Sequence, residues 1–227
     1  MALPRASASP SGVPPASLER FVLANTTAGV VPFVPEVRLY LGDDAIAIWE
    51  RTEAAAGDKD RQPPFWAFPW AGGQALARYV LDHREIVAGR AVLDLGSGSG
   101  LTAVAAAVAG ASRVLASEVD EFAIAAIGLN AALNGVRADT TGDVLDGEAA
   151  GFDVVLAADI WYQRDLAARA LGLLRRVAVR GGTVLAGDLG RAFLPREELR
   201  ELAAYEIPVA ADLESAPTRR AAVLTLR

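Results

Sequence analysis

From Ala91 to the end of the chain, short apolar runs alternate with longer stretches in which apolar residues recur at helical spacing. Apolar runs of about five residues are typical of strands in a buried sheet, and the longer stretches are typical of amphipathic helices. The run VVLAA at 154–158 is apolar on both faces, which favours a central parallel strand between two helix layers. The strands predicted in this half are 91–95, 113–117, 137–140, 153–158, 183–187 and 219–226.

Helical patterns fill the spaces between these strands. One helix begins at Leu101 and stops at Gly110, and another begins after Asp120, whose side chain can cap it. A third occupies much of 166–180. Strands that alternate with helices through short, right-handed connections predict an α/β fold, namely a doubly wound, Rossmann-like, three-layer sandwich with a mostly parallel seven-stranded sheet.

The first 90 residues have a different pattern. Two apolar runs, 37–41 and 45–49, predict a hairpin around the tripeptide GDD, and a polar loop follows at 52–64. Residues 1–17 hold four of the twelve prolines and are predicted to form a disordered tail. We therefore expect one structural domain in three segments: the tail 1–17, an accessory segment 18–90 that forms a small hairpin and helix cap on the core, and the core 91–227.

The composition excludes several kinds of chemistry. The chain has no cysteine and one histidine, His83, so a disulfide, a thiolate nucleophile and a multi-histidine metal site are excluded, and no metal is expected. Its 22 basic and 28 acidic side chains give a net charge of −6, which disfavours a nucleic-acid partner. The longest apolar run, near 101–111, is about half of the ~20 residues that a membrane-spanning helix needs, so no membrane partner is expected. The expected location is the cytoplasm, because the chain shows neither cysteine nor a secretory signal.

A glycine-rich segment, VLDLGSGSG, follows the first strand of the core and opens a helix. Gly96, Gly98 and Gly100 allow a tight turn and a close approach of the backbone to a ligand. Their spacing is G-x-G-x-G, so the dinucleotide pattern G-x-G-x-x-G is not met. Asp94 is suited to orient a cationic ligand, and the sulfonium amino acid of S-adenosylmethionine fits it better than a dinucleotide does. The alternative is a purely structural turn.

Acidic residues at the ends of the next two strands extend this prediction. Glu118 is placed to accept hydrogen bonds from a ribose diol, although NAD sites use an acid at the same place. Asp120 is better explained as a helix cap than as a ligand. Asp143 and the Val144 amide are candidates for binding adenine, through its exocyclic amine and a ring nitrogen, but Asp143 is equally suited to cap its loop.

The segment Asp159-Ile160-Trp161-Tyr162 ends the fourth predicted strand, where ligands of such folds bind. Asp159 is suited to hold an amine, and Trp161 and Tyr162 to enclose its methylene stem or its cation. The spacing is similar to the Asp/Asn-Pro-Pro-Tyr signature of amino-group methyltransferases, but Pro-Pro is missing. The alternative is that Asp159 caps the strand and the two aromatic residues pack in the core. Asp188, at the end of the next predicted strand, is equally suited to a structural and a functional role. His83, at a helix end, favours a packing role.

The segment from Pro64 to about Asn134, and above all its block FWAFPWAGGQALARY, resembles the lysine methyltransferases that modify the β-subunit of electron transfer flavoprotein. These belong to the seven-strand methyltransferases. The similarity continues through 159–162 and 187–191, although Leu189 stands where that group tends to have proline. The resemblance implies S-adenosylmethionine as cofactor and a protein lysine at 159–162. It implies that the cofactor is bound by Asp94, Gly96, Gly98 and Glu118, with Trp70 and Gly73 beside it.

The sequence therefore predicts an S-adenosylmethionine-dependent protein-lysine N-methyltransferase, with the electron transfer flavoprotein β-subunit as protein partner. A sulfonium donor needs no covalent nucleophile, which suits a chain without cysteine. Three alternatives stay open: methyl transfer to another protein, a small-molecule amine or a nucleobase; a cofactor-binding module without catalysis; and, least favoured, an NAD dehydrogenase.

Overall fold

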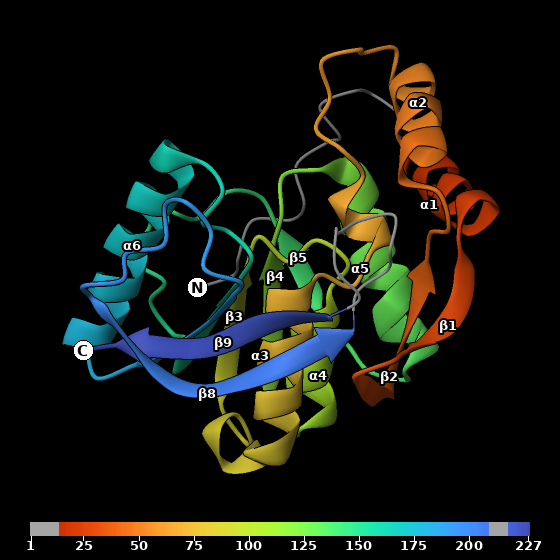
Figure 1. The fold of residues 1–227 in the computed structure, drawn as a ribbon. Helices are drawn as coiled ribbons and strands as arrows, with labels where there is room; N and C mark the ends of the chain where they lie inside the picture. Colours follow the sequence, from red (N-terminus) through yellow and green to blue (C-terminus); the bar gives the residue numbers. More distant parts are fainter. Residues whose placement is uncertain (1–13, 209–217) are drawn as a thin grey trace.

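The centre of the molecule is a mostly parallel sheet. The computed structural model describes residues 14–208 and 218–227, and within them the sheet has seven strands in the order β5-β4-β3-β6-β7-β9-β8 (Figure 1). The strands from β5 to β7 in that order are parallel, whereas β9 is antiparallel to both of its neighbours. The bounds are β3 Ala91–Leu95, β4 Arg113–Ser117, β5 Asp139–Thr141, β6 Val154–Ala158, β7 Thr183–Asp188, β8 Leu199–Pro208 and β9 Thr218–Leu226.

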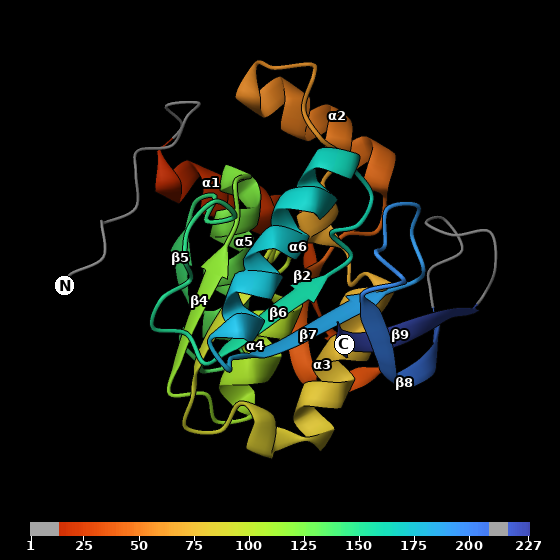
Figure 2. The same ribbon diagram turned by 90° about the vertical axis from the view of Figure 1, so that its left-hand side faces the viewer.

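Helices cover both faces of this sheet. Helices α3 (Ala71–Asp82), α4 (Leu101–Val108) and α5 (Glu121–Leu133) contribute to the apolar cluster on one face, and α6 (Arg164–Val179) covers the other (Figure 2). Side chains of a strand alternate between faces, so Val92 packs towards α3 and α4 whereas its neighbour Leu93 packs under α6. Burial on both faces explains the continuous apolar runs in the sequence. The predicted three-layer α/β fold is confirmed.

The N-terminal segment packs on this core through α5. It comprises α1 (Pro15–Asn25), the antiparallel pair β1 (Thr27–Val31) and β2 (Val34–Leu41), α2 (Ala45–Ala56) and the short 3₁₀ helices η1 (Phe65–Ala67) and η2 (Arg84–Ile86). Two α5 side chains join β2: Asn130 Oδ1 accepts from the Tyr40 amide at 2.8 Å, and Asn134 bonds both backbone groups of Arg38. A third apolar cluster, which includes Leu18 and Phe122, seals α1 against α5.

Two predictions for the N-terminal segment are wrong. The run 45–49 is not the second strand of a hairpin but the start of α2, where Asp44 caps the helix by accepting from the Ala47 amide at 2.9 Å. The hairpin is formed instead by β1 and β2. Residues 15–17, assigned to a disordered tail, belong to α1, and Pro14 is the N-cap of that helix; residues 1–13 lie outside the described residues.

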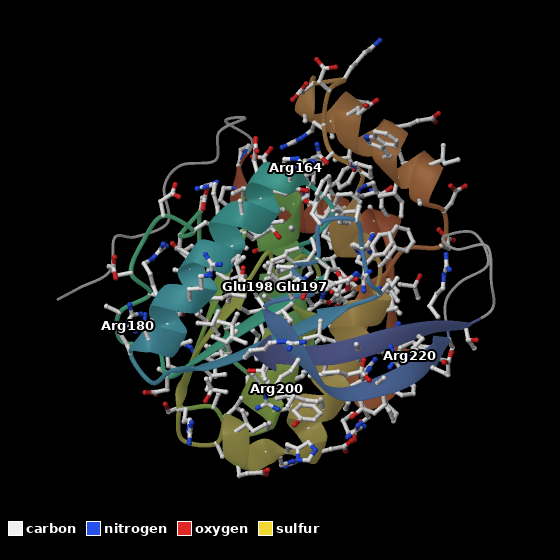
Figure 3. The ribbon with its side chains drawn as sticks, turned by 60° about the vertical axis from the view of Figure 1, so that its left-hand side comes forward. Arg164, Arg180, Glu197, Glu198, Arg200 and Arg220 are labelled. Atoms are coloured by element: carbon white, nitrogen blue, oxygen red, sulfur yellow. The ribbon has the colours of Figure 1, made fainter. Side chains whose placement is uncertain are left out.

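The sequence pattern also missed strand β8. Its sequence LRELAAYEIP is rich in helix-forming residues, but a long antiparallel pairing with β9 holds it extended. Arg220 on β9 donates a hydrogen bond to Glu201 on β8. Figure 3 labels Arg220 and also Arg200, which precedes Glu201 on β8. In residues 14–208 and 218–227, no helix is long and apolar enough to cross a membrane.

Candidate active site

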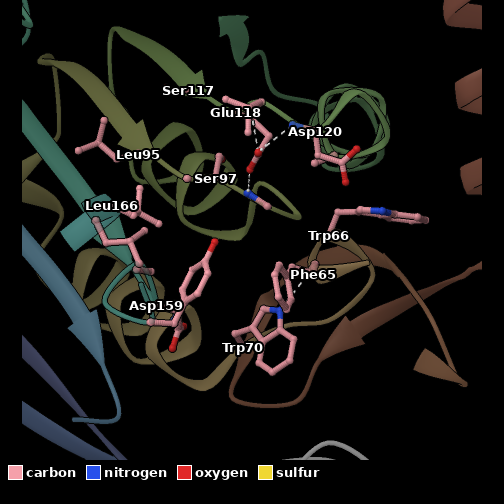
Figure 4. A pocket seen from close by; sticks show the side chains of 18 of the residues that line it. Phe65, Trp66, Trp70, Leu95, Ser97, Ser117, Glu118, Asp120, Asp159 and Leu166 are labelled. Atoms are coloured by element: carbon pink, nitrogen blue, oxygen red, sulfur yellow. Dashed lines mark hydrogen bonds between the residues drawn. The ribbon is translucent and has the colours of Figure 1, made fainter. Parts of the chain in front are cut away.

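A cavity of about 580 Å³ opens at the carboxyl ends of β3, β4 and β6, where ligands of doubly wound folds bind. Figure 4 shows Ser97 and Glu118 on one side of it and Asp159 and Trp70 on the other. We call the first side the cofactor end and the second the acceptor end. The predicted site residues that line the cavity are Trp70, Gly73, Gly96, Gly98, Glu118, Asp143, Asp159 and Tyr162.

The glycine loop forms the floor of the cofactor end. Gly96 and Gly98 have φ values of 58° and 53°, a conformation that disfavours residues with a Cβ. A Cβ on Gly98 would meet nothing within 4 Å, because the residue faces the open cavity, whereas one on Gly96 would lie 2.9 Å from the Ile160 side chain. Gly100, with φ of 81°, caps α4 and is not a lining residue, so it serves the turn.

Asp94 holds this loop from behind. Strand alternation turns it towards α4, where it is fully buried and accepts hydrogen bonds from Ser97 Oγ at 2.6 Å and Thr102 Oγ1 at 2.7 Å. Burial raises the pKa of this carboxyl to about 6, although the two hydroxyl groups oppose the rise. Asp94 is not a lining residue of the cavity, and its expected role towards a cationic ligand stays a prediction.

Glu118 joins the glycine loop to the end of β4. Its Oε2 accepts from the Gly98 amide at 2.9 Å, and its Oε1 accepts from the amides of Val119 at 2.7 Å and Asp120 at 3.1 Å. The carboxylate lines the cavity beside the loop. The Asp120 side chain accepts from the Phe122 amide at 3.0 Å, which confirms that it caps α5.

The loop after β5 contributes one predicted residue to the cavity. Asp143 lines it, but the same carboxylate accepts from the Leu145 amide at 2.9 Å and pairs with Arg169 at 2.8 Å. Asp143 therefore caps its loop, and its predicted hydrogen bond with the adenine amine stays a prediction. Val144 packs towards the apolar cluster under α6 and does not line the cavity; its neighbour Leu145 does.

Asp159 is the centre of the acceptor end. It follows β6 with φ of 55°, a left-handed conformation that aspartate tolerates better than most residues. Its Oδ2 accepts from the Gly73 amide at 2.8 Å, in the first turn of α3, and its Oδ1 accepts from Arg191 Nη2 at 3.2 Å. Burial raises the pKa of Asp159 to about 6, even though Arg191 and the Gly73 amide lower it. At neutral pH this carboxyl is ionised.

A pair of glycines makes that geometry possible. A Cβ on Gly72 would lie 2.5 Å from the Gly187 carbonyl oxygen and 2.7 Å from Asp159 Oδ2. Because neither Gly72 nor Gly187 has a side chain, the start of α3 packs directly on the end of β7 and brings the Gly73 amide to Asp159.

The aromatic wall differs in part from the prediction. Tyr162 lines the cavity, is 39% exposed and lies 5.8 Å from the Phe65 ring, measured between centroids. The prediction for Trp161 is wrong: this side chain is fully buried in the apolar cluster under α6 and does not line the cavity. Left-handed Asp159 turns the chain there, so that alternate residues no longer face the same side. Phe65 and Trp70 supply the wall instead.

Three other outcomes concern residues around the site. Asp188 is buried and accepts from the amides of Gly190 and Arg191, so its position shows a structural turn. His83 is outside the cavity lining and packs on the Tyr79 ring, as its place at a helix end indicated. The sequence interpretation missed Arg191 as a lining residue, and its one signal was the arginine that closes the segment GDLGR.

The cavity suits S-adenosylmethionine. Its volume is within the range of small-molecule sites, and Gly98 leaves an open surface that a side chain would fill. Glu118 offers a carboxylate acceptor for a diol, and aromatic rings at the acceptor end suit a cationic sulfonium. No group of histidine, cysteine or acidic residues in the described part of the chain is arranged to hold a metal.

Known proteins match this combination of fold and site. The family described as ribosomal protein L11 methyltransferase (PrmA) matches residues 74–163. The Mus musculus electron transfer flavoprotein beta subunit lysine methyltransferase is 39% identical over 182 residues, which cover 77% of this chain and 70% of the relative. The Xenopus laevis protein of the same name is 39% identical over 186 residues, with coverages of 80% and 74%. A candidate methyltransferase solved in complex with SAH has the same fold, with a TM-score of 0.50 and 13% identity over 84% of this chain and 53% of that chain.

The fold, the glycine loop and these matches define a seven-strand, S-adenosylmethionine-dependent methyltransferase. Because the similarity to the vertebrate relatives extends over more than two thirds of each chain, the protein belongs to the family of electron transfer flavoprotein beta subunit lysine methyltransferases.

Proposed function

We propose that this enzyme transfers a methyl group from S-adenosylmethionine to a lysine side chain of the electron transfer flavoprotein β-subunit. The names of the family's members support the substrate. The observation that carries the proposal is the Asp159 carboxylate, which is only 11% exposed, shares one cavity with the glycine loop and is walled by Phe65, Trp70 and Tyr162.

The cofactor end would hold S-adenosylmethionine through Gly96, Gly98 and Glu118, with Trp70 and Gly73 nearby. When bound, the cofactor supplies a methyl group made electrophilic by its sulfonium. Asp94 acts from behind, since it anchors the loop to α4 through two hydroxyl groups. Asp143 and Leu145 close the side of the cavity where we place the adenine.

The acceptor end would prepare the lysine amine. A lysine has a pKa of about 10.4 in water and attacks only after it loses a proton, so an apolar wall that disfavours the charged form assists it. Phe65 and Tyr162 provide such a wall and exclude water. Asp159 accepts a hydrogen bond from the amine and orients its lone pair, and the released proton passes to solvent through the open mouth. The chain's own contribution is alignment, which is worth several kcal/mol in many enzymes.

One observation favours a second substrate. The family description that matches residues 74–163 is that of ribosomal protein L11 methyltransferase, and a Geobacter sulfurreducens protein of that name is 40% identical over 144 residues. That similarity covers only 47% of the relative, so we rank ribosomal protein L11 second.

The test offers both candidate substrates to the purified enzyme. Recombinant electron transfer flavoprotein and ribosomal protein L11 are incubated separately with S-adenosylmethionine, and lysine methylation is mapped by mass spectrometry. We expect methyl groups on lysines of the flavoprotein β-subunit. Methylation of L11 alone would replace the proposed substrate with the second. Methylation of neither protein, together with nuclease-sensitive label in a cell extract, would overturn protein methylation.

The net charge of −6 supports the expectation that nucleic acid is not the substrate. The cytoplasmic location stays a prediction.

A further inference from the structure

Arg191 places a fixed positive charge at the acceptor end. Its side chain lines the cavity and is 26% exposed, and its guanidinium carbon lies 6.0 Å from the centroid of the Trp70 ring. It belongs to the loop after β7, whose turn is held by Asp188 through the amides of Gly190 and Arg191 itself. The loop therefore aims the guanidinium at Asp159, to which it donates one hydrogen bond of 3.2 Å.

The guanidinium lies between two buried carboxylates. Asp159 is 11% exposed and Asp188 is fully buried, and both face Arg191. Arg191 Nε and Asp188 Oδ2 are 3.8 Å apart, and both are buried atoms without a hydrogen-bond partner among the described residues. Buried polar atoms without partners are rare in folded proteins, so this arrangement calls for an explanation beyond packing.

We infer that Arg191 is a positioning residue of the methyl-acceptor site. It keeps Asp159 ionised and turned towards the Gly73 amide, so an incoming amine meets a carboxylate that is already paired with a cation. This inference rests on the proposed function, because it assigns a role in the same acceptor site. Without Arg191, burial would leave Asp159 protonated and unable to accept a hydrogen bond from the amine, or ionised only by holding the lysine as its ammonium. With Arg191 beside it, Asp159 still accepts a hydrogen bond, but the pair has no net charge and stabilises the ammonium less.

The surroundings of Asp159 support this role. From its own loop Tyr162 faces the cavity, from β4 Glu118 faces it on the far side, and from β7 Asp188 adds a second negative charge. Among the described residues, Arg191 is the cation that donates a hydrogen bond to Asp159. Asp188, with an oxygen to spare, lets the guanidinium shift without losing all its partners when an amine takes over Asp159.

Three variants separate this role from a structural one. Arg191→Met removes the charge and keeps most of the side-chain volume, and Arg191→Lys restores the charge. The matched control is Arg196→Met, because Arg196 donates to the Gly190 carbonyl in the same loop and does not line the cavity. The first readout needs no substrate: the titration of the Asp159 carboxyl carbon by ¹³C NMR, assigned with Asp159→Asn.

We expect Arg191→Met to raise the midpoint of the Asp159 titration by at least about one pH unit, and Arg191→Lys to reverse most of that rise. Arg196→Met should leave the midpoint unchanged. A midpoint that is the same in wild type and Arg191→Met would overturn the inference.

The second readout is the pH profile of methyl transfer. At about pH 6.5 we expect Arg191→Met to lower kcat/KM at least about threefold, and the deficit to shrink above about pH 8.5, where Asp159 ionises without help. A deficit that is constant with pH would show a structural latch and contradict the inference. If no candidate protein is methylated but the NMR midpoint moves as expected, the proposed substrate fails, whereas the pairing of Arg191 with Asp159 is still supported.

Discussion

The two ends of the cavity are built in different ways. The cofactor end comes from one strand-loop-helix segment, 91–108, joined to the end of the next strand by Glu118. The acceptor end comes from three segments far apart in the sequence, which supply Trp70 and Gly73, then Asp159, then Arg191. The first end is therefore a local property of the chain, whereas the second exists only when α3, β6 and β7 are packed together.

This difference predicts where single substitutions act. At the acceptor end, a change should affect catalysis or packing at a distance, because each residue is held by another segment. At the cofactor end, a change should affect binding of S-adenosylmethionine or the local stability of the loop.

The largest effect is expected at Asp159. Asp159→Asn keeps an oxygen for the Gly73 amide but removes the charge that orients the amine. We therefore expect kcat to fall about a hundredfold and the Kd for S-adenosylmethionine to stay within about threefold of the wild-type value. Steady-state kinetics and calorimetry measure the two quantities. Asp153→Asn is the control, since Asp153 precedes the opposite end of the same strand and bonds the Ala91 amide. Equal losses of turnover and cofactor affinity would refute the division into two ends.

The next effect concerns the packing of α3 on β7. Gly72→Ala places a Cβ 2.5 Å from a backbone oxygen, so it should lower the free energy of unfolding by about 2 kcal/mol and reduce activity as α3 moves away from Asp159. Gly73→Ala is the matched control: its Cβ would meet atoms only at 3.7 Å or more, so it should leave stability unchanged or raise it by up to about 1 kcal/mol. Urea denaturation compares the two. Equal destabilisation would show that the glycine contact is not what limits the approach of α3.

A smaller effect is expected at Glu118. Glu118→Gln replaces one carboxylate oxygen by an amide N–H donor, although three backbone N–H groups already point at this carboxylate. Because two donors cannot bond each other, the glycine loop should loosen, and the Kd for S-adenosylmethionine should rise roughly tenfold. Turnover at saturating cofactor should change little. A fall in turnover with unchanged affinity would place Glu118 functionally at the acceptor end.

The same difference explains what the sequence could predict. Gly96, Gly98 and Glu118 are close in sequence, so spacing and strand ends were sufficient to place them in the cavity lining. Trp161 was misplaced because strand alternation does not extend past the left-handed turn at Asp159. Arg191 was missed because nothing local shows that the loop after β7 points at the end of β6.

The accessory and C-terminal segments show the limits of local pattern in the fold itself. The first five residues of α2 form an apolar run like that of a buried strand, but the Asp44 cap and the helix-forming residues that follow make them helical. Strand β8 has the composition of a helix and is extended only because it pairs with β9. In both cases the deciding contacts involve backbone groups that a hydrophobic pattern does not describe.

The smallest predicted effect tests how the cofactor end uses Asp94. Its pKa is about 6 in the folded protein and near 3.8 ordinarily, so the folded state binds a proton that the unfolded state lacks between those values. Wild-type stability from this group therefore falls as pH rises through that window and stays low above it. The amide introduced by Asp94→Asn does not titrate, so the stability of this variant relative to wild type should be higher at pH 7.5 than at pH 4.5, by about 2 kcal/mol.

Urea denaturation at the two pH values measures this difference, and one that shrinks as pH rises would contradict the burial argument. Repeating it with saturating S-adenosylmethionine adds a sharper test. Bound cofactor could remove the higher stability of Asp94→Asn at pH 7.5. In that case the positive charge of the cofactor offsets the unfavourable ionisation of Asp94 in the wild-type protein. The carboxylate would then act on a cationic ligand through charge, although Ser97 and Thr102 occupy its hydrogen bonds. If the advantage persists, Asp94 serves the loop alone.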